Sequence, residues 1–186
     1  MRQAVVLLEE PSARVVTEEI AKRLGISDRL VAIEHQGKSD LESSVARKII
    51  HWRSPLPPRF IIVRDNDGGD CRQLKERLRG LVPEPSRERV KIRLAIHELE
   101  GWYQGDLVAV EAAGLIAHGK AEELQPKQKY RDPDRLANAK QEFRRLTNVT
   151  GQISIARRVS PHMSLENNKS ISFSHFISAL RWATEV

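Results

Sequence analysis

Short apolar runs alternate with amphipathic segments over the first 118 residues of this chain, and this alternation restricts the fold more than any other feature. Four runs have the length and the β-branched content that are typical of buried strands. They span residues 4–8, 30–33, 60–63 and 90–96. Strands that alternate with helices imply a largely parallel sheet with helices on both faces. Lys91 and Arg93 alternate with apolar residues in the fourth run, which predicts a strand near a sheet edge.

The segments after the strands carry apolar residues at helical spacing. We expect a helix between residues 13 and 24, one that ends at Trp52, one over 71–81 and one over 97–117 with a break near Gly105. Ser12 is expected to cap the first of these helices. Either Ser39 or Asp40 is expected to cap the second.

Beyond residue 118 the alternation ends and the charge changes. Residues 119–186 carry 12 Lys and Arg against 7 Asp and Glu, whereas residues 1–118 carry 19 against 18. Residues 127–134 have the composition of a loop. Helical spacing predicts three further helices, over 135–146, 151–159 and 173–182. We therefore expect an α/β domain over 1–118 and a basic helical extension over 119–186 that packs on it.

Carboxylates follow three of the four predicted strands. Asp65 and Asp67 end the third strand, and because they are two residues apart their side chains point the same way in an extended chain. Glu9 ends the first strand, and Glu98 and Glu100 follow the fourth. The carboxyl ends of parallel strands meet at one edge of a sheet. Two carboxylates about 4 Å apart repel by roughly 4 kcal/mol at an effective dielectric constant of 20. A cation, a lysine or protonation must relieve this repulsion. We expect a hard cation that prefers oxygen, Mg²⁺ or Mn²⁺.

These segments resemble the TOPRIM domain of topoisomerases, primases and several nucleases. Leu7-Leu8-Glu9 matches the glutamate that closes the first TOPRIM strand, and Asp65-Asn66-Asp67 matches the Asp-x-Asp that closes the third. Glu10 stands where a glycine usually follows the glutamate. With residues 37–41 and 98–106, the chain is most similar to a bacterial family of TOPRIM-like proteins often encoded beside ABC-type or AAA ATPases. The resemblance implies a Rossmann-like, mostly parallel sheet of about four strands.

The resemblance also implies roles for the strand-end carboxylates. Asp65 and Asp67 would be metal ligands at the catalytic centre, and Glu9 would be a third ligand or the general acid/base. Glu98 and Glu100 are two residues apart, so they cannot both face the site once a helix has begun. We therefore expect one of the two to act at the site. Glu98 would be a ligand of a second metal ion, or Glu100 would be a base.

Asp70 has two possible roles. It is either a further metal ligand or the N-cap of the helix that begins at Cys71. The sequence does not choose between them, because both roles use the same carboxylate at the end of the same turn.

A carboxylate site beside a basic extension suits a polyanionic substrate, DNA or RNA. Paired arginines in the extension are expected to contact phosphates in a salt-dependent way. They are Arg144, Arg145, Arg157 and Arg158. Lys38, in a Gly-Lys-Ser turn after the second strand, is a further candidate for phosphate contact. The sequence predicts nucleic acid as the partner and leaves the oligomeric state open.

The resemblance implies Mg²⁺-dependent cleavage of nucleic-acid phosphodiester bonds, in genome defence with an ABC- or AAA-type ATPase as partner. The alternative is a non-catalytic TOPRIM-like module that binds or regulates such an ATPase or nucleic acid. Cys71 is the single cysteine, which fits a reducing cytosol. No apolar run approaches the roughly 18 residues that a membrane span needs, and the N-terminus has no signal-peptide pattern. We therefore expect a cytoplasmic protein without membrane contact.

Overall fold

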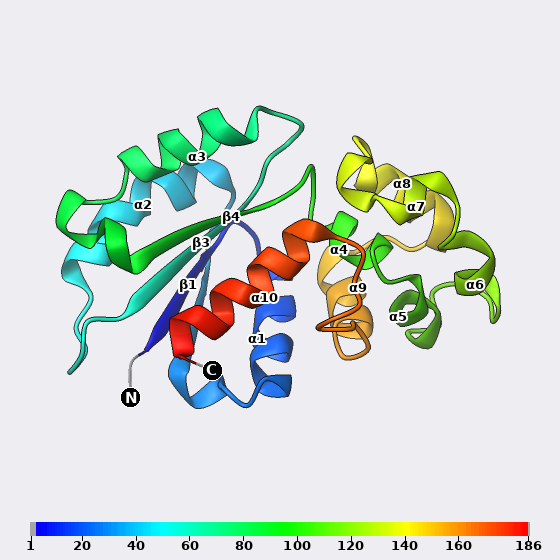
Figure 1. The fold of residues 1–186 in the computed structure, drawn as a ribbon, viewed down its shortest axis with the longest axis horizontal. Coiled ribbons are helices and arrows are strands. Elements are labelled where there is room, and N and C mark those ends of the chain that lie inside the picture. The colour runs from blue at the N-terminus through cyan, green and yellow to red at the C-terminus, as the bar shows by residue number, and fades with distance from the viewer. Residues whose placement is uncertain (1–2, 186) are drawn as a thin grey trace.

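The computed structural model describes residues 3–185. Within them, a four-stranded parallel sheet with the strand order β2-β1-β3-β4 forms the centre (Figure 1). The strands are β1 (Ala4–Leu8), β2 (Leu30–Glu34), β3 (Arg59–Asp65) and β4 (Val90–Ala95). The predicted parallel α/β sheet is confirmed, and so is the edge position of its fourth strand.

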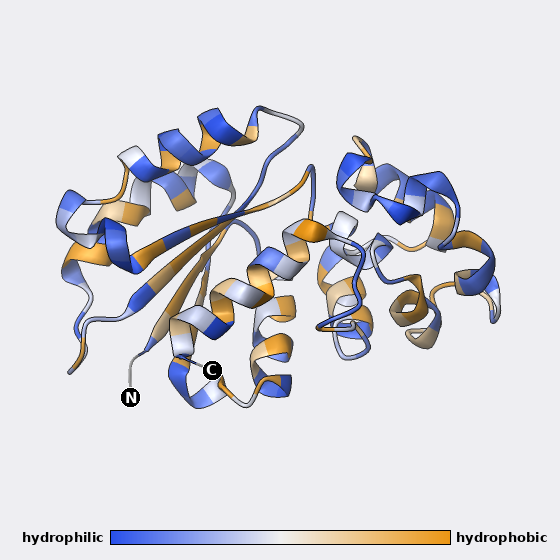
Figure 2. Ribbon diagram, viewed as in Figure 1, coloured by the Kyte–Doolittle hydropathy of each residue, from blue (hydrophilic) through white to orange (hydrophobic). Residues whose placement is uncertain are grey.

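Helices cover both faces of this sheet. They are α1 (Pro11–Arg23), α2 (Lys38–His51), α3 (Cys71–Gly80) and α10 (Ile171–Thr184). α1 and α10 pack on one face, and α2 and α3 lie over the other (Figure 1). Val6 and Leu8 of β1 join the core beneath α1 and α10, while Val5 and Leu7 join the core beneath α2. β1 is apolar along its whole length because both faces of this central strand are buried (Figure 2).

Short helices between β4 and α10 form a lobe beside the sheet (Figure 1). They are α4 (Glu100–Gln104), α5 (Leu107–Ala112), α6 (Lys120–Leu124), α7 (Gln128–Arg131), α8 (Ala139–Thr147) and α9 (Gln152–Val159). The predicted break near Gly105 is confirmed, since Asp106 caps a new helix by accepting a hydrogen bond from the Ala109 N–H at 3.0 Å. The predicted loop over 127–134 is wrong, because it contains α7 and most of a 3₁₀ helix, Pro133–Arg135. The remaining 3₁₀ helices are Ser27–Arg29 and Glu84–Arg89.

Two helices begin earlier than the predicted caps allow. α1 begins at Pro11, whose fixed φ suits the first helical position, so Ser12 lies inside the helix. α2 begins at Lys38, so neither Ser39 nor Asp40 is its N-cap. Both helices therefore start directly at the carboxyl edge of the sheet.

The last helix returns the chain from the lobe to the sheet, where α10 packs on β3 and β4. Trp102 of α4 stacks on Phe176 of α10 with ring centroids 5.0 Å apart. The Trp102 indole N–H donates to Ser172 Oγ at 2.9 Å. Lobe and sheet thus share one apolar core, and a domain boundary at residue 118 stays a prediction. No helix within residues 3–185 has the length and apolarity to cross a membrane.

Candidate functional site

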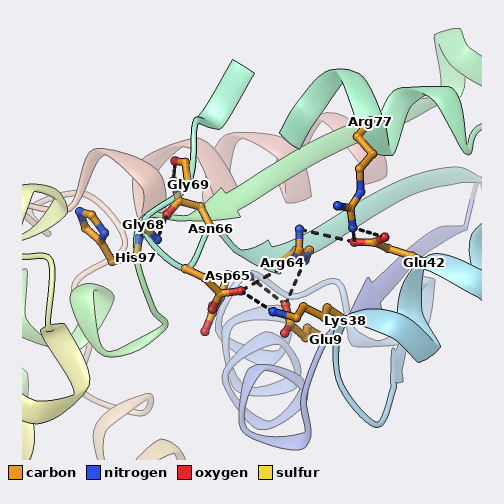
Figure 3. A network of polar contacts seen from close by, with 11 residues as sticks. Glu9, Lys38, Glu42, Arg64, Asp65, Asn66, Gly68, Gly69, Arg77 and His97 are labelled. Carbon is orange, nitrogen blue, oxygen red and sulfur yellow. Dashed lines mark hydrogen bonds and ion pairs between the residues drawn. The ribbon is translucent and has the colours of Figure 1, made fainter. Parts of the chain in front are cut away.

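The carboxyl ends of β1 and β3 bring Glu9 and Asp65 together. The two strands are neighbours, with Leu8 paired to Val63, so the residues after them meet at one edge of the sheet. Glu9 Oε2 accepts a hydrogen bond from the Asp65 backbone N–H at 3.2 Å (Figure 3). Strand pairing alone therefore places two of the predicted site carboxylates side by side.

Arg64 of β3 is the central cation of this edge. It is buried, and its guanidinium nitrogens lie 3.6 Å from Glu9, 3.4 Å from Glu42 and 3.7 Å from Asp67. Lys38 adds a second positive charge, with its Nζ 3.5 Å from Asp67 Oδ2. We call Glu9, Lys38, Glu42, Arg64 and Asp67 the Arg64 cluster. It neutralises much of the negative charge that the strand ends bring together.

Arg64 and Glu42 were not among the residues predicted from the sequence. A signal for Arg64 was present, because it interrupts the apolar run of a buried strand and a buried arginine needs carboxylate partners. Glu42 has no such local signal. It lies on α2 and also pairs with Arg77 of α3, so only the packing of the two helices identifies its partners (Figure 3).

Asp65 differs from Glu9 and Asp67 in having no counter-charge. Within residues 3–185 its carboxylate accepts no hydrogen bond and has no ion-pair partner. Burial raises the pKa of Asp65 well above its usual value, and neighbouring carboxylates raise it further. These neighbours are Glu10, Glu9, Glu100 and Asp67. Asp65 is therefore the point of the site that most needs a positive charge.

Glu100, the first residue of α4, has the properties of an acid/base group. It is 4% exposed, and burial raises its pKa from 4.5 to about 7. The charges of Glu10 and Glu98 act in the same direction, while the Glu100 backbone N–H and Lys140 oppose them. A carboxyl group with this pKa can hold or release a proton at neutral pH. Burial raises the pKa of Glu9 as well.

The donor set at this edge suits a hard divalent cation. The candidate ligands are carboxylate oxygens, and a cation would relieve the repulsion at Asp65. Among residues 3–185, however, no three His, Cys, Asp or Glu side chains converge closely enough to hold a metal ion. The Arg64 cluster explains this, because Arg64 draws Glu9 and Asp67 towards its guanidinium. Metal binding therefore requires these carboxylates to exchange Arg64 for the cation, or water and substrate oxygens to complete the shell.

Asn66 holds the turn that carries Asp67. Its buried side chain donates to the Gly69 carbonyl oxygen at 2.8 Å and accepts from the N–H groups of Gly68 at 2.8 Å and His97 at 3.2 Å (Figure 3). Asp67 has φ +51° and Gly68 φ +75°, so two successive residues adopt the left-handed region. The sequence pattern did not single out Asn66, although asparagine is a common residue in such turns. Its hydrogen bonds join the ends of β3 and β4.

Asp70 and Glu98 serve helix ends in this structure. Asp70 Oδ1 accepts from the backbone N–H groups of Arg72 at 2.7 Å and Gln73 at 2.9 Å, which makes it the N-cap of α3. The Gln73 and Arg72 N–H groups lower the pKa of Asp70. Glu98 Oε2 accepts from the backbone N–H of Lys140 at 2.8 Å, in the first turn of α8. A metal-ligand role for either carboxylate stays a prediction.

The basic residues of the extension lie on exposed helix faces. Arg144 and Arg145 are in the last turn of α8, and Arg157 and Arg158 are in the last turn of α9. Arg158 Nη2 donates to the carbonyl oxygens of residues 113 and 114 at 2.9 and 3.2 Å, so it caps the end of α5. Phosphate contact by these arginines and by Lys38 stays a prediction.

Solved structures with the same fold come from proteins named OLD. The C-terminal region of the Xanthomonas campestris pv. campestris OLD protein matches with a TM-score of 0.57 and 16% identity, over 99% of this chain and 94% of that chain. The C-terminal region of the Burkholderia pseudomallei OLD protein matches with a TM-score of 0.56 and 14% identity, over 97% and 98%. This chain shares the fold of OLD C-terminal regions. No protein-family model and no curated protein matches it. At these identities the likeness concerns the fold, which includes the helical lobe as well as the sheet.

Proposed function

We propose that this protein is a TOPRIM-type, metal-dependent nuclease that cleaves phosphodiester bonds in DNA or RNA at the strand-end carboxylates. The observation that carries the proposal is the Asp65 carboxylate, which is half-buried without a counter-charge beside Glu9 and under the influence of Glu100. An ionised Asp65 is destabilising without a counter-charge, and either protonation or a bound cation relieves it. A divalent cation at a phosphate substrate would supply this relief.

Asp65, Asp67 and Glu9 would hold Mg²⁺ or Mn²⁺. When bound, the cation would stabilise the negative charge that develops on the phosphate during cleavage. Glu100, whose pKa is about 7, would accept a proton from the attacking water or donate one to the leaving oxygen. Lys38, at the first position of α2, would contact a substrate phosphate through its ammonium group.

A role in genome defence with an ABC- or AAA-type ATPase partner is part of the proposal. It rests on the resemblance to TOPRIM-like proteins encoded beside such ATPases. The shared fold supports it in one respect, because the matching OLD structures are C-terminal regions, which in those proteins form one part of a longer chain. A fold that works as one part of a larger protein is suited to act with a partner.

A second candidate function is a non-catalytic module that binds an ATPase or nucleic acid. The Arg64 cluster favours it, since Arg64 and Lys38 already neutralise Glu9 and Asp67 without a metal ion. In this case the cluster stabilises the fold, and within residues 3–185 Asp65 keeps no ion-pair partner.

A cleavage assay with a matched pair of variants separates the two functions. Purified protein is incubated with labelled DNA and RNA, single- and double-stranded, with Mg²⁺, Mn²⁺ or EDTA. Asp65→Asn removes the proposed ligand, and Asp28→Asn makes the same chemical change at an exposed position outside the site. We expect cleavage by wild type and Asp28→Asn with metal, and none by Asp65→Asn or in EDTA.

An inactive wild-type protein is next assayed with an ABC- or AAA-type ATPase from its gene neighbourhood, since the active form can require the partner. Absence of cleavage under every condition would refute the nuclease proposal. Equal cleavage by wild type and Asp65→Asn would refute the site.

A further inference from the structure

Two adjoining hollows follow the free edge of the sheet along β4. The first, of 300 Å³, lies between α3 and β4, and the second, of 390 Å³, lies between β4 and the start of α10. Lys75 and Arg93 line both, so the two hollows lie next to each other. We call them together the β4-edge groove. None of the residues proposed for metal binding, catalysis or phosphate contact lines it.

Basic residues of two elements line the β4-edge groove. Lys75 and Arg79 come from α3, which Figure 2 shows as largely hydrophilic, and Lys91 and Arg93 come from β4. Arg87 adds a cation near the start of β4 and lies 3.9 Å from the exposed Glu84. Several basic residues along one groove are the pattern expected for a bound polyanion.

Most of these charges have no internal partner. Within residues 3–185, Lys75, Arg79, Lys91 and Arg93 form no ion pair with a carboxylate. Lys91 instead lies over the Trp182 ring at 4.3 Å, and Arg93 donates to main-chain carbonyl oxygens. Burial lowers the pKa of Lys91, and the charge of Arg93 lowers it further. The groove therefore holds positive charge that the protein itself does not neutralise.

Acidic residues in the groove do not cancel this charge. Glu76 lines the first hollow beside Lys75. Asp134 lines the second, but its carboxylate accepts hydrogen bonds from Ser170 Oγ at 2.7 Å and from the Ser172 N–H at 2.8 Å. The Asp134 charge is thus used at the N-terminus of α10.

The groove ends at the candidate active site. Ile96 lines its second hollow, and the next residue, His97, is hydrogen-bonded to the turn after β3. The His97 N–H donates to Asn66 Oδ1 at 3.2 Å, and the Asp67 N–H donates to the His97 carbonyl oxygen at 3.1 Å. A chain that follows β4 towards its carboxyl end therefore reaches the turn that carries Asp67.

We propose that the β4-edge groove binds the phosphate backbone of a single-stranded nucleic acid and leads that strand to the strand-end carboxylates. A single strand fits better than a duplex, because hollows of this size admit one extended chain. No Phe, Tyr or Trp stands among its lining residues within 3–185, and the exposed His175 offers a single imidazole ring, so we expect mainly backbone contact with little base selection. The direction of the strand rests on the proposed function, whereas the binding itself does not.

The test compares two double variants that remove the same charge. Lys75→Gln/Arg79→Gln changes two exposed residues of α3 that line the groove, and Arg47→Gln/Arg53→Gln changes two exposed residues outside it. Glutamine is a good helix former, so α3 is expected to be retained. Binding of labelled single-stranded DNA and RNA is measured by fluorescence anisotropy in EDTA over a series of salt concentrations.

We expect the groove variant to bind at least tenfold more weakly than wild type. The slope of log K against log salt concentration should become shallower by about 1.4. The variant loses two phosphate contacts, and each contact contributes about 0.7 to the slope for a single strand. The control variant should bind within about twofold of wild type, as expected for residues away from the contact. Equal binding by the two variants would overturn the proposal, and so would a groove that captures an acidic peptide but no nucleic acid.

The cleavage assay keeps this result separate from the proposed function. A protein that binds through the groove but never cleaves refutes the nuclease and retains the groove. A protein that cleaves, but whose groove variant binds like wild type, refutes the groove and retains the nuclease.

Discussion

Replacing Arg64 by methionine should destabilise the metal-free protein by about 3 kcal/mol. The Arg64 side chain is 7% exposed, and those of Glu9 and Glu42 are each 17% exposed, so its loss leaves carboxylates in a poorly solvated place. Breaking a buried ion pair from one side costs about 3–5 kcal/mol. The lower limit applies here, because Glu42 keeps Arg77 and Asp67 keeps Lys38.

The measurement is urea unfolding followed by circular dichroism, at neutral pH in EDTA and again with Mn²⁺. Arg64→Lys keeps the charge but loses the forked geometry, so we expect a smaller loss. Arg181→Met is the matched control, because its guanidinium is exposed and 4.0 Å from Glu166. The control should change the free energy of unfolding by less than about 0.5 kcal/mol.

Mn²⁺ should stabilise Arg64→Met more than wild type, because the carboxylates that Arg64 contacts become free to bind the ion. A loss below about 1 kcal/mol in EDTA, the value of a surface ion pair, would refute the central role of Arg64. Equal stabilisation of Arg64→Met and wild type by Mn²⁺ would refute the competition between Arg64 and the metal.

Three further changes test other parts of the structure. The pKa of Glu100 is about 7 against 4.5 unfolded, so the native state binds its proton more tightly and wild type should lose up to about 3 kcal/mol as pH rises between these values. Glu100→Gln should remove this loss, and parallel stability–pH profiles from urea unfolding would contradict the assignment. Asp70→Ala should cost about 1 kcal/mol because α3 loses its N-cap. Its Mn²⁺ affinity by calorimetry should be unchanged, and a lost affinity would make Asp70 a ligand. Gly105→Ala should cost about 2 kcal/mol in thermal unfolding, because a Cβ there would lie 2.1 Å from Asn168 Oδ1 and 2.7 Å from the Ser170 nitrogen. An unchanged melting temperature would show that the neighbouring loop moves aside.

The sheet and its acidic edge could be predicted from the sequence because they depend on local pattern and one rule of topology. Apolar runs of strand length, each followed by a helical segment, were sufficient for the parallel order. Alternating Lys91 and Arg93 placed β4 at an edge. Parallel strands end at the same side, so Glu9 and Asp65 were expected at one edge of the sheet. That β1 and β3 are neighbours, which brings the two residues into contact, came from the structure.

Only the tertiary structure decided which charged side chains contact each other. Arg64 reaches Glu42 because α2 packs over β3, and nothing in the local sequence of either element encodes that contact. Asp70 and Glu98 accept hydrogen bonds from helix N-termini because those helices begin beside them. Within residues 3–185, no helix N-terminus donates to the Asp65 carboxylate in this way. The spacing of apolar residues along the sequence indicates backbone geometry and burial, and both depend on residues that are close together in the chain. The partner of a charge depends on distances and desolvation between remote segments, which change with shifts of a few ångströms.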